Sequence, residues 1–283
     1  MSKEIRDILK NIDARPKKGL GQNFLINKRK INRISDEVKN DVYDSIIEIG
    51  PGLGSITKKI IDSKSKIICI EKDTTLYNYL KEEFLDKTNI QILNRDILKC
   101  NLKEIGNGNK LYFGNLPYNI GTKIIENFTD TFYSDHTTSG IFMLQKEVGE
   151  KILSNRSTKL YNGFVVKIQS FYNVKRVLNL NESDFWPQPN IKSILIRLEN
   201  KKKKFLNAFE YKDFTKFLFN SFSVRRKKLT NNLQKHYSKD LVCEKLKELK
   251  LDENIRAQDI KVETFMLLYN KLINNKSLWA TYL

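Results

Sequence analysis

The chain has 283 residues, of which 40% are hydrophobic and 30% charged, and its formal net charge is +18. The hydrophobic fraction can fill a core, which argues against wholesale disorder. The positive charge favours a polyanionic partner, nucleic acid ahead of an anionic membrane, although the Lys- and Asn-rich chain of an AT-rich genome would carry a similar surplus. Three scattered cysteines and two histidines predict no disulfide and no zinc site, and they fit a cytoplasmic protein. No apolar run approaches the ~20 residues of a membrane helix, so we expect no membrane association.

The first two-thirds of the chain alternates short β-branched runs with longer amphipathic stretches. Four runs predict buried strands, at 45–49, 66–71, 90–93 and 110–114. Helical patterns at 55–61 and 75–85 separate the first three, and further strands are predicted near 140–144 and 191–198. Strands that alternate with helices indicate crossover connections, so we predict an α/β fold with a parallel sheet and helices on both faces.

The pattern changes at the lysine run Lys201–Lys204, which we interpret as a solvated linker. Beyond it, apolar residues recur at helical spacing: Phe214, Phe217, Leu218 and Phe222. Neither glycine nor proline follows Pro189, so this part of the chain contains no strong helix breaker. We therefore predict two domains, an α/β domain over 1–200 and a small all-helical domain over 201–283.

A glycine-rich turn, Glu48-Ile-Gly-Pro-Gly-Leu-Gly54, follows the first predicted strand. Its glycines let the backbone approach a ligand closely, although the same turn can serve tight packing alone. The spacing Gly-x-Gly-x-Gly differs from the Gly-x-Gly-x-x-Gly of dinucleotide folds. Glu71 ends the second strand, where it can bind a ribose, and Asp96 follows the third, where it can bind an adenine amino group. Each alone could be a solvated loop charge, but together they favour an adenosyl cofactor.

The fourth predicted strand ends in Asn115-Leu-Pro-Tyr118. The exocyclic nitrogen of adenine is a weak nucleophile, because its lone pair is delocalised into the ring. The Asn115 amide oxygen and the Leu116 carbonyl can accept its two hydrogens, while Pro117 fixes the turn. Tyr118 offers a flat face for an extruded base. Catalysis would then rest on positioning and electrostatics, and a structural Asn-Pro turn with a core tyrosine is the alternative.

Six motifs, in order, carry a family resemblance. They are Gly19-Leu-Gly-Gln-Asn-Phe-Leu25, Glu48-Ile-Gly-Pro-Gly-Leu-Gly54, Asn115-Leu-Pro-Tyr-Asn-Ile120, Met143-Leu-Gln-Lys-Glu-Val148, Phe185-Trp-Pro-Gln-Pro-Asn-Ile-Lys-Ser193 and Phe222-Ser-Val-Arg-Arg-Lys-Lys-Leu229. Together they resemble the small-subunit (16S) ribosomal RNA adenine dimethyltransferases over roughly residues 15 to 235. The erythromycin-resistance methylases of large-subunit RNA share the first three motifs.

The resemblance implies a Rossmann-like methyltransferase domain that uses S-adenosylmethionine without a metal, and a helical C-terminal domain that contacts RNA. It implies dimethylation of N6 on two adjacent adenosines near the 3′ end of small-subunit rRNA. The implied cofactor residues are Gln22, Asn23, Leu25, Glu48, Gly50, Gly52, Glu71, Asp96 and Asn115. The implied catalytic residues are Asn115, Leu116, Pro117, Tyr118 and Phe185, with Tyr118 and Phe185 on either side of the target base.

Two basic clusters could contact RNA phosphates. The first flanks the cofactor motif and consists of Arg15, Lys17 and Lys18. The second lies on a predicted helix and consists of Arg225, Arg226, Lys227 and Lys228. A charge run is often only a solvated face, but for the second cluster we favour phosphate contact, which positions RNA without reading its sequence.

The expected partner is rRNA within a partly assembled small ribosomal subunit, and we expect a monomer with no obligate protein partner. Two alternatives remain open: a large-subunit methyltransferase of the erythromycin-resistance type, and a catalytically idle assembly factor that keeps the cofactor pocket. A nicotinamide oxidoreductase is disfavoured by the glycine spacing and by the lack of a plausible proton-relay residue.

Overall fold

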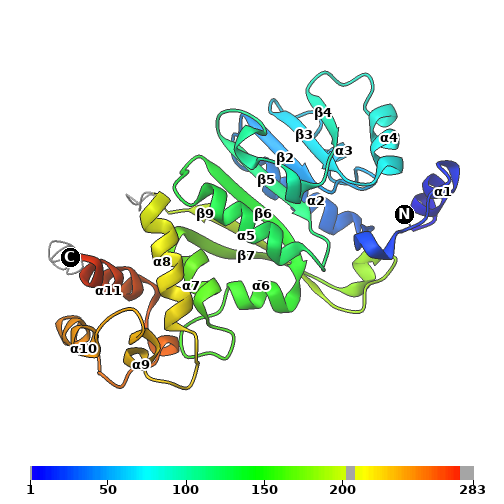
Figure 1. Cartoon of the computed structure of the whole chain (residues 1–283). Helices are drawn as coiled ribbons and strands as arrows, with labels where there is room; N and C mark the ends of the chain where they lie inside the picture. Colours follow the sequence, from blue (N-terminus) through cyan, green and yellow to red (C-terminus); the bar gives the residue numbers. More distant parts are fainter. Residues whose placement is uncertain (1, 202–207, 275–283) are drawn as a thin grey trace. The chain divides into compact units, whose positions relative to one another are not determined.

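A computed structural model describes residues 2–201 and 208–274 of the chain (Figure 1). Its contacts divide the chain into two compact units. The sheet unit comprises Met1–Gly149 and Asn173–Lys201, and the helical unit comprises Glu150–Tyr172 and Lys202–Leu283. The sequence predicts one boundary near residue 200, whereas here the chain also enters and leaves the helical unit between 150 and 172. The predicted assignment of the two domains to catalysis and RNA contact stays a prediction.

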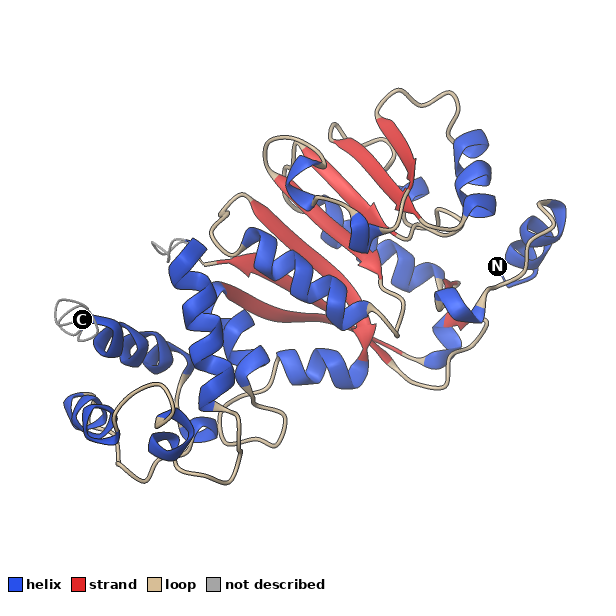
Figure 2. Cartoon of the chain, in the orientation of Figure 1, coloured by secondary structure: helices blue, strands red, loops and turns tan. Residues whose placement is uncertain are grey.

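Seven strands form the main sheet, in the order β4-β3-β2-β5-β6-β9-β7 (Figure 2). Their bounds are β2 Ser45–Ile49, β3 Lys66–Glu71, β4 Ile90–Asn94, β5 Lys110–Asn115, β6 Thr138–Gln145, β7 Tyr172–Leu180 and β9 Ser193–Asn200. The predicted parallel arrangement is confirmed for β4, β3, β2, β5 and β6, but β9 runs antiparallel to β6. Two short strands, β1 Phe24–Leu25 and β8 Phe185–Trp186, pair separately.

The helices alternate with the strands in the first half of the chain and dominate the end. In the first part they are α1 Ser2–Asn11, α2 Lys28–Lys39, α3 Thr57–Ile60, α4 Thr74–Glu83, α5 Gly121–Phe132 and α6 Lys146–Ile152. The helical unit contains α7 Gly163–Phe171, α8 Ala208–Ser221, α9 Leu229–Leu233, α10 Lys239–Glu248 and α11 Val262–Asn274. No helix in the described ranges is long and apolar enough to cross a membrane.

Helices cover both faces of the sheet, as the alternation along β5 shows. Leu111 and Phe113 belong to a core cluster that includes residues of α2 and α3. Tyr112 points to the opposite face, where its ring lies 5.7 Å from Phe128 and 5.4 Å from Phe132 of α5. Because successive side chains of a strand alternate between faces, one apolar run fills both cores.

An aromatic core holds the helical unit together. Phe214 and Phe217, which the helical spacing singled out, are buried on α8 and pack against Tyr269 of α11 at 5.3 and 5.6 Å. Phe171 of α7 lies 6.0 Å from Phe214. This contact explains why the chain segment that contains α7 groups with the C-terminal helices.

A buried arginine ties β9 to the C-terminal end of α2 within the sheet unit. The Arg197 side chain is only 7% exposed and donates to Glu199 Oε1 at 2.7 Å and to Glu37 Oε1 at 3.1 Å. It also pairs with Asp41 and donates to the Tyr43 hydroxyl at 3.0 Å. Because this guanidinium is buried away from water, its ion pairs with the carboxylates must compensate for its lost hydration.

We expect Arg197→Met to lower the free energy of unfolding by about 2–4 kcal/mol, because it leaves Glu37 and Asp41 without their cation. Lys175→Met is the matched control: Lys175 pairs with the same Glu199 at 3.2 Å but its side chain is 66% exposed. Exposed pairs contribute roughly 0–1 kcal/mol. Equal losses for both variants in urea titrations would contradict the assignment.

Candidate active site

The glycine-rich turn leaves the carboxyl end of β2 in a conformation that glycine alone adopts easily. Gly50, Gly52 and Gly54 have φ values of +65°, +61° and +72°. A Cβ on Gly50 would meet nothing within 4 Å, whereas one on Gly52 would lie 3.2 Å from the Phe24 ring. The turn therefore borders open space at Gly50 and is closed at Gly52. The helix predicted over 55–61 is shorter than expected, because α3 covers only Thr57–Ile60.

Glu71 ends β3 with a carboxylate that the backbone holds in place. Oε2 accepts the Gly52 N–H at 3.1 Å and Oε1 accepts the Asp73 N–H at 2.9 Å. Burial raises the pKa of Glu71, and these backbone hydrogen bonds oppose the shift. Each oxygen keeps a further lone pair, so Glu71 can still accept a hydrogen bond from a hydroxyl group.

Asp96 lies two residues beyond β4 rather than at its end, and it caps a short 3₁₀ helix through the Leu98 N–H at 3.0 Å. Its other oxygen lies 2.9 Å from Lys72 Nζ. Burial raises the pKa of Asp96, but the hydrogen bonds from Lys72 and Leu98 outweigh burial and lower it overall. Asp96 is therefore an anion whose outer oxygen is shared with Lys72.

The N-terminal segment is held beside β3 by Asp73, the N-cap of α4. Asp73 Oδ2 accepts from Gln22 Nε2 at 2.9 Å and pairs with Lys17 Nζ at 2.9 Å. Burial raises the pKa of Asp73, but these contacts and the Thr75 N–H lower it overall. Asp73 was not predicted from the sequence, although an aspartate directly before Thr74 is a typical N-cap signal.

Asn115 closes β5 with a side chain of fixed orientation. Its Nδ2 donates to the Asn23 backbone carbonyl at 2.9 Å. Only the NH₂ group of an amide can donate, so this bond determines which way the amide points. In the described part of the chain Oδ1 accepts no hydrogen bond, and it remains available as an acceptor.

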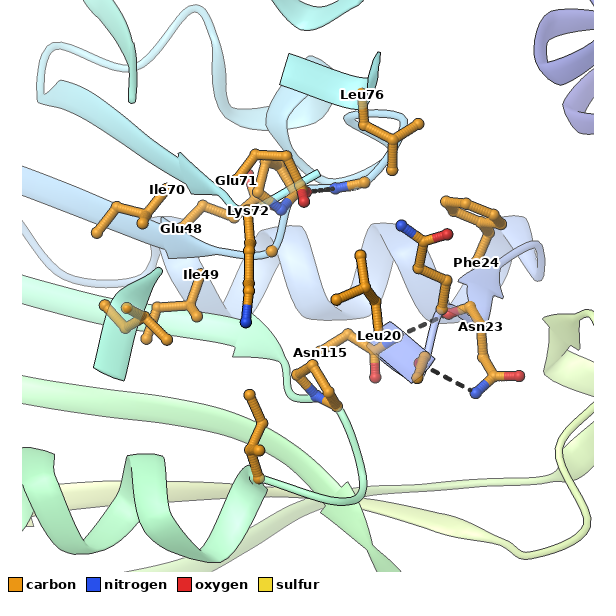
Figure 3. A pocket seen from close by; sticks show the side chains of 18 of the residues that line it. Leu20, Asn23, Phe24, Glu48, Ile49, Ile70, Glu71, Lys72, Leu76 and Asn115 are labelled. Carbon is orange, nitrogen blue, oxygen red and sulfur yellow. Dashed lines mark hydrogen bonds between the residues drawn. The ribbon is translucent and has the colours of Figure 1, made fainter. Parts of the chain in front are cut away.

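These elements enclose a pocket in the sheet unit with an empty volume of about 1120 Å³, including space open to solvent (Figure 3). The figure shows Glu48, Glu71 and Lys72 on one side and Asn23 and Phe24 on the other. Ten of the predicted site residues line it: Gln22, Asn23, Leu25, Glu48, Gly50, Gly52, Glu71, Asp96, Asn115 and Pro117. Lys72 and Arg95 also line it and were not predicted from the sequence.

Three predicted catalytic residues lie outside the pocket lining. Leu116 is buried, and Tyr118 is half-buried beside the pocket-lining Pro117. Phe185 is 2% exposed and belongs to the core cluster of the sheet unit. Phe185 is buried because β8 pairs with β1 in a register that places it among the core side chains, and its stacking on a target base stays a prediction.

The basic clusters also differ from the sequence-based picture. Arg225–Lys228 lie in the turn between α8 and α9, not on a helix. Arg225 donates to the carbonyls of Tyr161 at 3.0 Å and Thr158 at 2.7 Å, and Lys228 donates to Asn254. Arg226 and Lys227 are exposed and have no side-chain partner among the described residues.

In the N-terminal cluster the three basic residues have different surroundings. Arg15 is exposed. Lys17 forms an ion pair with Asp73, and this contact helps to hold the N-terminal segment that lines the pocket. The side chain of Lys18 lies outside the described part of the structure.

Glu48 is a buried acid at the base of the pocket, 3% exposed. Burial raises its pKa to about 8, against the hydrogen bond that Thr57 Oγ1 donates to Oε2 at 2.5 Å, and nearby Glu71 adds to the rise. The two acids on neighbouring strands therefore differ in their surroundings. Glu48 is buried and protonated at neutral pH, whereas Glu71 accepts hydrogen bonds from backbone N–H groups.

The sheet order and the pocket at the carboxyl ends of its strands define a Rossmann-like α/β fold. Two solved structures share the fold: a dimethyladenosine transferase from Plasmodium falciparum, with a TM-score of 0.75 and 23% identity over 87% of this chain and 95% of that one, and the 23S rRNA methyltransferase ErmE, with a TM-score of 0.70 and 20% identity over 89% of this chain and 100% of that one.

The family model for ribosomal RNA adenine dimethylase matches residues 14–274. The ribosomal RNA small subunit methyltransferase A of Ureaplasma urealyticum serovar 10 is 35% identical over 281 residues, which cover 96% of this chain and 97% of that protein. The chain therefore belongs to the ribosomal RNA adenine dimethylase family, which confirms the resemblance seen in its motifs.

We expect the buried Glu48 to make stability depend on pH. Its folded pKa of about 8 exceeds the ordinary 4.5, so the unfolded state loses its proton first as pH rises. Between these two pKa values, the free energy of unfolding of the wild type should therefore fall by about 1.4 kcal/mol per pH unit relative to Glu48→Gln. Urea titrations at pH 5.5, 6.5 and 7.5 measure the difference.

Glu82→Gln, on the exposed surface of α4, is the matched control for the substitution itself. A constant difference between wild type and Glu48→Gln across the three pH values would show that Glu48 is ionised in the folded protein.

Proposed function

We propose that this protein transfers methyl groups from S-adenosylmethionine to N6 of two adjacent adenosines near the 3′ end of small-subunit rRNA. The proposed setting is a partly assembled small ribosomal subunit in the cytoplasm, with the protein acting as a monomer. The observation that carries the proposal is the Asn115 amide, whose Nδ2 is bound to Asn23 while Oδ1 stays available. The small-subunit name of the 35%-identical relative supports the choice of substrate.

The pocket residues fit an adenosyl cofactor. Glu71 presents acceptor oxygens for ribose hydroxyls, and the open space at Gly50 allows a ligand to approach the backbone. Asp96 would accept a hydrogen bond from the adenine amino group, and this bond would replace its contact with Lys72. Gln22, Asn23 and Leu25 would border the methionine end. When bound, the cofactor supplies a methyl group on a positively charged sulfur.

The protein's own contribution is to position the target amine. Asn115 Oδ1 and the Leu116 carbonyl would accept the two N–H hydrogens of the unmethylated amine, which orients the nitrogen lone pair towards the pocket. Each transfer would release one proton from N6 to solvent, and the monomethylated amine would donate its one remaining N–H to one of these acceptors. Leu116 N is bonded to the Met143 carbonyl at 3.1 Å, so the turn that carries both acceptors is anchored to β6. Preorganised acceptors need no rearrangement during the reaction, which is the usual source of such rate gains.

The basic residues divide into structural and RNA-contacting groups. Arg225 stabilises the helical unit through two backbone carbonyls. Arg226 and Lys227 carry exposed charges in the same turn, and we assign them to phosphate contact. Arg15 would contribute from the N-terminal segment.

We expect labelled S-adenosylmethionine to yield N6,N6-dimethyladenosine in undermethylated small subunits and not in large subunits or duplex DNA. Asn115→Ala should lower kcat by at least about 100-fold, since it removes a preorganised acceptor. Asn101→Ala, which removes an exposed amide outside the pocket lining, is the matched control. Cofactor affinity is measured in parallel by calorimetry.

Wild-type turnover by Asn115→Ala with intact cofactor binding would refute the proposed role of Asn115. Label in large-subunit RNA would instead identify a large-subunit methyltransferase. Cofactor binding with no label in any substrate would identify an idle assembly factor.

We expect Arg226→Ala/Lys227→Ala to reduce the slope of log affinity against log salt by about 1.5–2 units, because two phosphate contacts are lost. Lys239→Ala/Lys247→Ala, which removes the same charge from α10, is the control for net charge. Filter binding to small-subunit RNA at several salt concentrations measures both slopes. Identical slopes for the two double variants would show that the turn makes no special phosphate contact.

A further inference from the structure

A hydrogen bond joins the catalytic turn to a distant strand. The Tyr118 hydroxyl lies 2.7 Å from Ser193 Oγ, although the two residues are 75 positions apart in the sequence. Ser193 begins β9 and is fully buried, whereas Tyr118 is half-buried beside the pocket. No role for Ser193 follows from the reaction itself, so the contact needs its own explanation.

Strand β6 pairs both with β5, which precedes the Tyr118 turn, and with β9, which begins at Ser193. On one side Asn115 pairs with Met143, and on the other Ser193 pairs with Gln145. Met143 and Gln145 are two positions apart, so they lie on the same face of β6 and within one strand repeat. The amide of Asn115 and the hydroxyl of Ser193 are thus fixed relative to each other by one continuous backbone.

The orientation of the Tyr118 ring depends on the contact that its hydroxyl makes with Ser193. Its backbone is restrained, because Pro117 fixes the turn and the N–H groups of Ile120 and Gly121 bond to the Pro117 carbonyl at 3.1 and 2.8 Å. Its ring, however, can rotate about χ1 unless its far end is held. Phe185, the other predicted stacking residue, is only 2% exposed, whereas Tyr118 is half-buried beside the pocket.

We propose that Ser193 is a positioning residue whose hydroxyl fixes the Tyr118 ring relative to Asn115. The proposal rests on the proposed function, because the ring would orient an extruded adenine so that its amine meets Asn115. The proline-rich segment that ends in Ser193 would thus act on the target base through this hydrogen bond. Burial raises the pKa of Tyr118, so the phenol keeps its proton at neutral pH and the bond persists.

The test is a double-mutant cycle with Ser193→Ala and Tyr118→Phe on undermethylated small subunits at saturating cofactor. We expect each single variant to lower kcat by about five- to tenfold, as for a lost hydrogen bond of ordinary strength. The double variant should fall no further, while the KM for the cofactor stays unchanged. Ser35→Ala is the matched control, since Ser35 is equally buried in the same unit and donates to the Ile31 carbonyl at 2.8 Å.

Additive losses in the double variant, or equal losses in Ser193→Ala and Ser35→Ala, would overturn the proposal. A second readout is independent of turnover: fluorine NMR of 3-fluorotyrosine placed at position 118. A single sharp resonance that shifts or splits in Ser193→Ala, and not in Ser35→Ala, supports the positioning role, and an unchanged resonance refutes it. If the wild type methylates nothing, the proposed function fails while this spectrum still decides the role of Ser193.

Discussion

The parallel sheet imposes the constraint on which the site depends, because the carboxyl ends of its parallel strands meet at one edge. Strands β2, β3 and β5 end at Ile49, Glu71 and Asn115, and each end delivers one component of the pocket: a glycine turn, an acid and an amide. The register between neighbours keeps these ends level. The N-terminal segment then completes the pocket, since the Asn23 carbonyl orients the Asn115 amide.

Much of this edge could be predicted from the sequence, because short β-branched runs followed by Gly, Glu or Asn are local signals. The direction of β9 could not, since an apolar run buried on both faces reads the same for either direction. The Arg197 cluster was also hidden, because Glu37 and Asp41 lie about 160 residues from it and only the folded chain brings them together. Non-local contacts of this kind leave no periodic trace.

Phe185 shows that a sequence motif does not by itself determine the orientation of its side chains. In a strand, neighbouring side chains point to opposite faces, so a shift of one residue would exchange the faces of Phe185 and Trp186. Pairing of Phe185 with Leu25 places the phenylalanine in the core, while Trp186 packs beside Phe24 in the cluster around α1. The aromatic-proline pattern identified the segment, but only the β1–β8 register decides which ring is buried.

Two buried acids near this edge of the sheet, Glu48 and Glu71, determine the electrostatics of the pocket. A cationic ligand favours nearby anions, but two close carboxylates in a buried site would repel each other. The two acids differ in environment: Glu48 accepts hydrogen bonds from the Thr57 hydroxyl and the Cys69 thiol, whereas Glu71 accepts two from backbone N–H groups. Protonation of Glu48 therefore relieves the repulsion between the two acids. Lys72 Nζ lies 2.9 Å from Asp96 and neutralises part of the charge of this carboxylate.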